Sequence, residues 1–130
     1  MQKKLNKIIF TAYIFAVLWL TLIDRTPTYH RMMLMPFWEY RNLLFSGNHL
    51  YWFQQIGCNI LMLMPLGFLL AMRKISTRNI VIIGCLFSVF IELTQLITAR
   101  GLCEFDDVFN NTLGAWIGCA IYRMDIFRRD

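Results

Sequence analysis

The sequence predicts an all-α, polytopic membrane protein: a four-helix transmembrane bundle with an aromatic-rich interfacial segment between its first two helices. Of the 130 residues, 58% are apolar and only 16% are charged, and the mean hydropathy is +0.50. Four long apolar runs are almost free of charge, and the basic residues lie between them. A soluble domain of this length would not need such runs. We therefore treat residues 1–130 as a single transmembrane domain.

The four expected spans cover approximately residues 8–23, 56–72, 80–98 and 108–122. Only the third contains a charged residue, Glu92. A bilayer core takes about 20 helical residues, so the first, second and fourth runs should recruit flanking residues. The first run lacks the small residues of a secretory cleavage site, and we expect it to remain as an uncleaved span.

The distribution of basic residues predicts the orientation in the membrane. One set of span ends holds nine of the 13 basic residues and the other holds four. The nine are Lys3, Lys4, Lys7, Arg73, Lys74, Arg78, Arg123, Arg128 and Arg129, and the four are Arg25, Arg31, Arg41 and Arg100. The positive-inside rule then places both termini in the cytoplasm. Because the charge lies between apolar runs and forms no basic face, no nucleic-acid partner is expected.

The connection over residues 24–55 lies outside in this topology and contains eight of the chain's 20 aromatic residues. They are Tyr29, Phe37, Trp38, Tyr40, Phe45, Tyr51, Trp52 and Phe53. Aromatic side chains prefer the headgroup layer, so we expect a short helix around Trp38 to Phe45 to lie along the outer leaflet. It is either an aromatic belt that anchors the bundle or a platform for a lipid-like or lipid-attached ligand.

Glu92 is the most informative polar residue because it lies within an expected span. It shares one helical face with Ser88 and Gln95. An acid at this depth costs on the order of 2.5–3.5 kcal/mol, so it marks either a functional site or a structural hydrogen bond between helices. Arg100 is the nearest basic residue in sequence. We expect Glu92 and Arg100 to be coupled, directly or through Gln95 and water.

The fourth run combines small and acidic residues. Gly114 and Gly118 form a G-x-x-x-G pattern and, with Pro65 and Gly67 of the second run, are expected to serve helix packing. Asp106 and Asp107 precede this run. They either cap the helix or bind a cation or transfer protons. Because Asp107 shares a face with Asn111 and Gly114, we expect Asp107 to be the functional acid and Asp106 to be the more tolerant of substitution.

Three separate stretches bring polar residues to the outer half of the membrane in this topology. The candidate ligand-binding residues are Asn59, Glu92, Gln95, Arg100, Glu104, Asp106, Asp107, Asn110 and Asn111. Neither the four cysteines nor the two histidines, His30 and His49, have the spacing of a metal site, so no metal and no cofactor are expected. A divalent ion held by Glu104, Asp106 and Asp107 is chemically reasonable, but no established loop spacing supports it.

Several of these segments together resemble the VanZ family of small bacterial membrane proteins. They are Asn59-Ile60, Pro65-Leu66-Gly67, Glu92-Leu93-Thr94-Gln95, Arg100-Gly101, Asp106-Asp107-Val108 and Asn110-Asn111-Thr112-Leu113-Gly114. The resemblance covers residues 59–118 well, and residues 1–51 only in general character. Glu104 stands where many members have Asp, a change that keeps the acid.

This resemblance implies a bacterial cytoplasmic-membrane protein associated with low-level resistance to teicoplanin, a lipid-tailed glycopeptide. Two functions then stand side by side. The protein either binds or modulates a surface lipid, a lipid-linked cell-wall intermediate or the lipoglycopeptide, or it is a small membrane enzyme. In the second case Glu92 and Asp107 are the candidate catalytic acid–base groups on a lipid-linked substrate. A transporter would need a homo-oligomer, because four spans enclose little lumen.

Overall fold

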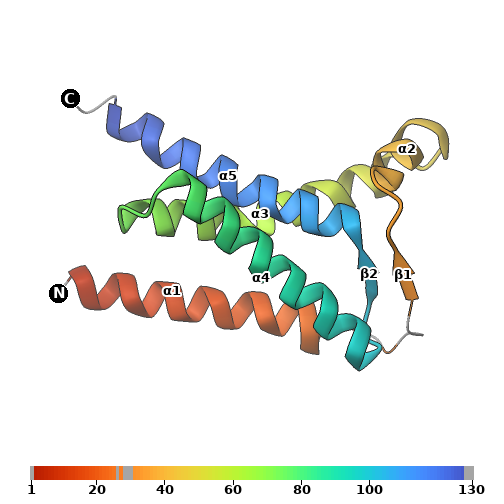
Figure 1. Cartoon of the computed structure of the whole chain (residues 1–130), viewed down its shortest axis with the longest axis horizontal. Coiled ribbons are helices and arrows are strands. Elements are labelled where there is room, and N and C mark those ends of the chain that lie inside the picture. Colours follow the sequence, from red (N-terminus) through yellow and green to blue (C-terminus); the bar gives the residue numbers. More distant parts are fainter. Residues whose placement is uncertain (1, 26, 28–30, 128–130) are drawn as a thin grey trace.

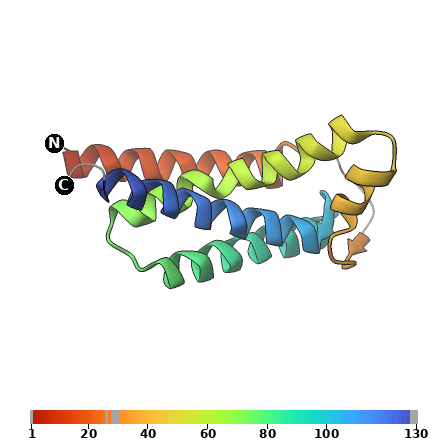
Figure 2. The same ribbon diagram turned by 90° about the horizontal axis from the view of Figure 1, so that it is seen from above.

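The computed structural model describes residues 2–25, 27 and 31–127. The chain runs through α1 (Gln2–Leu18), a π-helical turn (Trp19–Ile23), β1 (Arg31–Met33), α2 (Trp38–Phe45), α3 (His49–Met72), α4 (Thr77–Thr98), β2 (Leu102–Glu104) and α5 (Phe105–Phe127). The four long helices run alongside one another. Both chain ends lie at one end of the molecule, and α2 and the strands lie at the other (Figures 1 and 2). Tyr29, His30, Arg128 and Arg129 fall outside the described residues.

Three of the four expected spans are confirmed as helices long and apolar enough to cross a membrane: Lys4–Ile23, His49–Met72 and Thr77–Thr98. The second begins two turns earlier than the apolar run indicates, and α5 extends beyond both ends of residues 108–122. The shorter runs therefore recruit flanking residues, as their length requires. Helix α5 is not among the three, since Asn110 and Asn111 reduce its hydropathy. The fourth span remains a prediction.

The sequence-based expectation of helices alone overlooked a small parallel sheet. β1 pairs with β2, with Arg31 opposite Leu102 and Met33 opposite Glu104. Each strand is three residues long, which is too short for an alternating pattern to be recognised in the sequence. The short helix expected around Trp38 to Phe45 is confirmed as α2. Its position along the outer leaflet stays a prediction.

Helices α3 and α5 approach closely enough for glycine to be required at their contact. A Cβ atom at Gly114 would lie 2.0 Å from the Ile60 carbonyl oxygen, and one at Gly118 would lie 1.9 Å from that of Met64. A Cβ atom at Gly67 would lie 1.8 Å from the Ala115 carbonyl oxygen. These close approaches are consistent with the packing role expected for the three glycines. Pro65, by contrast, is exposed and lines a hollow of about 420 Å³ between α1, α3 and α5.

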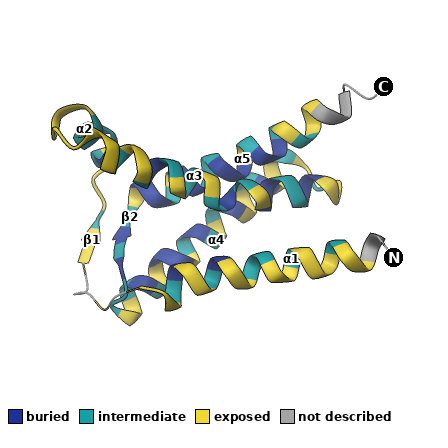
Figure 3. Cartoon of the chain, turned by 180° about the vertical axis from the view of Figure 1, so that it is seen from behind, coloured by how far each residue is buried: buried dark blue, intermediate teal, exposed yellow. Residues whose placement is uncertain are grey.

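The apolar core lies where α3, α4 and α5 meet, and α1 covers it only in part (Figure 3). Leu63, Ile80, Ile91 and Ala115 are fully or almost fully buried, whereas most of α1 is exposed. One hydrogen bond joins α1 to the second span: the Tyr13 hydroxyl donates to the Met62 carbonyl at 2.6 Å. An exposed apolar helix is unfavourable in water and suits a lipid environment.

The α3–α5 contact predicts opposite effects for two alanine substitutions in the same helix. Gly67→Ala should lower the free energy of unfolding by about 1–3 kcal/mol, because its methyl group meets the α5 backbone. Gly57→Ala is the matched control, since a Cβ at Gly57 has no atom within 4 Å. It should stabilise α3 by up to about 1 kcal/mol. Melting curves in detergent test both variants, and equal melting temperatures would contradict the predicted contact.

Candidate functional site

A polar pocket of about 220 Å³ lies at the end of the molecule that carries α2 and the sheet. Acidic residues come from α2, β2 and α5, a single arginine comes from the segment after α1, and aromatic residues come from α2 and the first turn of α3. The lining residues are Arg25, Trp38, Glu39, Tyr51, Trp52, Gln55, Leu102, Glu104 and Asp107. Segments distant in the sequence thus build one site.

The Asp106 side chain, in the first turn of α5, forms hydrogen bonds with the N-terminus of α2. Its carboxylate accepts hydrogen bonds from the backbone N–H groups of Phe37, at 2.6 Å, and Glu39, at 2.8 Å. These groups belong to the N-terminus of α2, where the helix itself leaves N–H groups without partners. Asp106 is wholly buried. It therefore caps a helix, but the helix is α2 and not its own.

Glu39 is held in the pocket wall by a chain of side-chain hydrogen bonds. Its Oε2 accepts from Asn110 Nδ2 at 3.0 Å, and Asn110 Oδ1 accepts from the Tyr40 hydroxyl at 2.5 Å. Glu39 is only 2% exposed. Burial, together with the nearby charges of Asp107, Glu104 and Asp106, raises the pKa of Glu39 to about 8. This carboxyl is therefore mostly protonated at neutral pH.

Glu104 and Glu92 connect the sheet to α4. The Glu104 backbone N–H donates to Glu92 Oε2 at 3.0 Å, and Trp38 Nε1 donates to Glu104 Oε1 at 3.1 Å. Burial also raises the pKa of the Glu104 carboxyl, although the Trp38 hydrogen bond and the charge of Arg25 oppose that shift. Glu92 is 3% exposed and lies behind the pocket lining. In this arrangement it positions Glu104.

Asp107 projects from the first turn of α5 and accepts a hydrogen bond from the side-chain amide of Asn59. Carboxylate oxygens of Glu39, Glu104 and Asp107 all lie within 4.8 Å of one another. These three oxygens could surround one small cation. The sequence predicts no metal and makes Glu104, Asp106 and Asp107 only a chemically possible set. In the structure Asp106 is bonded to α2, and Glu39 lies beside the other two acids.

Seven of the nine expected site residues lie away from the pocket lining: Asn59, Glu92, Gln95, Arg100, Asp106, Asn110 and Asn111. Gln95 donates to the Thr21 carbonyl at 2.9 Å, and Arg100 donates to the Ile23 carbonyl at 3.2 Å. Both bonds fasten α4 and its end to the segment after α1. Asn111 donates to Ser88 Oγ at 2.9 Å, which leaves its buried Oδ1 without a hydrogen-bond partner. Asn110 acts through Glu39.

Within the described part of the chain Glu92 and Arg100 have different direct partners, and their coupling through Gln95 and water stays a prediction. Arg100 reaches a backbone carbonyl, and Arg25 is the arginine that shares the pocket with the acids. Arg25, Glu39 and Gln55 were not singled out from the sequence. Their only sequence signal is that they flank or interrupt aromatic and apolar runs, which is common on any protein surface.

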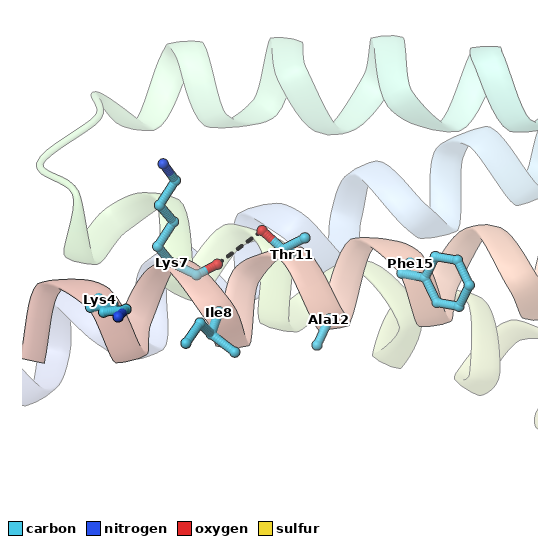
Figure 4. Close-up of a pocket in the computed structure, with 6 residues that line it drawn as sticks. All are labelled: Lys4, Lys7, Ile8, Thr11, Ala12 and Phe15. Atoms are coloured by element: carbon cyan, nitrogen blue, oxygen red, sulfur yellow. Dashed lines mark hydrogen bonds between the residues drawn. The ribbon is translucent and has the colours of Figure 1, made fainter.

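A larger hollow of about 720 Å³ follows the face of α1 and does not belong to this site. Six residues of α1 line it: Lys4, Lys7, Ile8, Thr11, Ala12 and Phe15 (Figure 4). The Thr11 hydroxyl is bonded to the Lys7 carbonyl of its own helix at 3.0 Å. No acid lines this hollow, and most of its exposed wall is apolar. It is therefore a groove along a helix that suits a lipid environment.

The sequence matches one protein family over most of its length. The family model described as VanZ/LLP1 matches residues 10–128. The chain belongs to the VanZ/LLP1 family. The family match therefore extends well beyond residues 59–118, into the α1 and α2 regions. Searches of curated proteins and of solved structures found no match. Family membership and the apolar helices together identify a VanZ-like membrane protein of a family linked to antibiotic resistance.

The two hydrogen bonds of Asp106 predict that its removal destabilises the fold, and its tolerance relative to Asp107 stays a prediction. Asp106→Ala should lower the free energy of unfolding by about 2–4 kcal/mol, because two buried N–H groups of α2 lose a charged acceptor. The exposed acid Asp24 provides the control, and Asp24→Ala should change it by less than about 0.5 kcal/mol. Denaturant titration in detergent measures both. A parental midpoint for Asp106→Ala would show that α2 does not depend on this cap.

Proposed function

We propose that this protein acts at the outer face of the cytoplasmic membrane and lowers susceptibility to lipid-tailed glycopeptides of the teicoplanin type. It does so by binding or modulating a surface lipid or a lipid-linked component. The observation that carries the proposal is the pocket, which joins acids, one arginine and aromatic rings beside the aromatic helix α2. Its place at the end opposite the termini supports an outer-face role in the proposed orientation.

The size of the pocket argues for a lipid headgroup over the antibiotic itself. At about 220 Å³ it has room for about seven water molecules of about 30 Å³ each. Sites for drug-sized ligands usually have about 300–1,000 Å³. A glycopeptide core is larger still, whereas the polar end of one lipid fits. Aromatic residues at the rim suit a ligand whose tail remains in the membrane.

The orientation is tested by thiol labelling of intact cells. In a background without native cysteines, Ser76→Cys in the α3–α4 connection should resist an impermeant thiol reagent. Asn48→Cys, just before α3, should react. Both positions are polar and adjoin helix ends, so differences in reactivity report the side of the membrane. Labelling of residue 76 without labelling of residue 48 would invert the proposed topology.

The functional test is protection of cells against teicoplanin. Asp107→Asn should abolish protection while the protein level and melting temperature stay near parental values, since the Asn amide oxygen can still accept the Asn59 hydrogen bond but the side chain lacks the charge. Glu92→Gln and Arg100→Gln should also reduce it, because they position Glu104 and the segment that carries Arg25. Arg41→Gln, exposed on α2, is the control. Full protection by Asp107→Asn would remove the pocket from the function.

A membrane enzyme that acts on a lipid-linked envelope substrate is the second candidate. The observation that favours it is the pKa of Glu39, about 8, in a pocket that also contains Asp107. A carboxyl that titrates near neutral pH is suited to proton transfer. Glu92 contacts the Glu104 backbone and not the pocket lining, so Asp107 is the better placed of the two candidate catalytic acids. Turnover of a lipid that purifies with the protein would favour this alternative.

A further inference from the structure

The chemistry of the pocket walls narrows the class of headgroup that it can bind. The lining contains three carboxyl groups and one guanidinium. The carboxylates favour a positively charged group on the ligand, and the guanidinium favours a negatively charged one. Two indole rings and one phenol ring also line the pocket. The ring centroids of Trp38 and Trp52 are 5.1 Å apart in an edge-to-face arrangement, and those of Tyr51 and Trp52 are 5.0 Å apart. Carboxylates with aromatic rings are the usual surroundings of an organic cation.

The three acids lie close enough together to hold one ammonium group. A primary ammonium directs three N–H groups tetrahedrally, and charged N–H···O bonds of about 2.7–2.9 Å place their acceptors about 4.4–4.7 Å apart. The oxygens of Glu39, Glu104 and Asp107 lie within 4.8 Å of one another. This limit fits three acceptors around one ammonium group, and a metal ion held by the same oxygens is the alternative that a chelator tests.

We propose that the pocket binds a zwitterionic ethanolamine-phosphate headgroup, with its primary ammonium among Glu39, Glu104 and Asp107 and its phosphate at Arg25. This inference rests on the proposed function and deepens it, because it names the chemical class of the surface lipid. The rings of Trp38 and Trp52 cover the ammonium, and the lipid tail leaves toward the membrane. A choline headgroup lacks the three N–H donors, so the pocket should discriminate between two headgroups of equal net charge.

Tryptophan fluorescence of the purified full chain provides the test. The chain has four tryptophans, and Trp19→Phe with Trp116→Phe leaves Trp38 and Trp52 as reporters in the pocket. Titration with dihexanoyl phosphatidylethanolamine should give binding at least about tenfold tighter than with dihexanoyl phosphatidylcholine, since each lost charged hydrogen bond is worth about a factor of ten or more. Equal affinity for the two lipids would overturn the ammonium assignment.

Matched variants separate the two charges of the headgroup. Glu39→Gln should weaken ethanolamine-lipid binding at least about tenfold and leave choline-lipid binding almost unchanged. Arg25→Gln should weaken both lipids by a similar factor, because both carry the phosphate. Arg41→Gln, on the same helix as Glu39 but outside the lining, should change neither. An Arg25 effect confined to one lipid would contradict the assignment of the phosphate.

A pH titration of the parent protein keeps the proposal testable even if Glu39→Gln fails to fold. Glu39 must lose its proton to hold the ammonium, and its pKa of about 8 reflects burial beside Asp107, Glu104 and Asp106. Affinity for the ethanolamine lipid should therefore rise between pH 6 and pH 8, by up to about tenfold per pH unit, and then level off. The amine itself stays charged over this range. An affinity that falls with rising pH would overturn the proposal.

Two further additions identify the source of the ligand. Free phosphoethanolamine should compete at least about tenfold more weakly than the lipid if the tail contributes, whereas equal competition would assign the pocket to a soluble ligand of the same chemistry. A chelator should leave binding unchanged, and loss of binding on chelation, restored by Mg²⁺, would assign the acids to a metal ion. The binding assays and the teicoplanin protection assay are independent measurements. The headgroup proposal can therefore fail while the proposed function holds.

Discussion

The close contact between α3 and α5 is the constraint on which the rest of the molecule depends. Gly67 on α3 and Gly114 and Gly118 on α5 allow each backbone to touch the other, so these two helices have one register and one separation. That register brings Asn59 beside Asp107 and places the head of α5 next to the first turns of α3. Without this register, the positions of Asp107 and of the aromatic residues that line the pocket would not be fixed.

The second structural theme is the burial of carboxyl groups at one end of the helices. Asp106 satisfies two backbone donors of α2, and Glu92 satisfies one of β2, so both acids position other residues without entering the pocket lining. Glu39, Glu104 and Asp107 remain directed at one shared volume. Placing acids in a buried site has an electrostatic cost: burial raises the pKa of Glu39 and of Glu104, and for Glu39 the nearby charges of Asp107, Glu104 and Asp106 raise it further. A bound cation would offset that cost.

Sequence reasoning recovered the elements that depend on local pattern. Apolar runs identified the long helices, aromatic density identified α2, and the spacing of Gly114 and Gly118 identified a packing face. It left Asp106 as either a cap of its own helix or a cation-binding or proton-transfer group, because capping rules are local, whereas in the structure this acid accepts hydrogen bonds from the N-terminus of α2. It paired Glu92 with Arg100 by proximity in the chain, although Arg100 contacts the Ile23 carbonyl. The parallel strand pair was overlooked because three residues carry no usable period.

The sequence by itself determined that the chain is a helical membrane protein with polar residues gathered near one end, because hydropathy and helical period are properties of contiguous residues. Only the tertiary structure decided which acids share a pocket. Glu39 and Asp107 are far apart in the chain, and Arg25 comes from a third segment. Their meeting depends on helix register and on the Asp106 cap, which are non-local contacts that no pattern within one segment encodes.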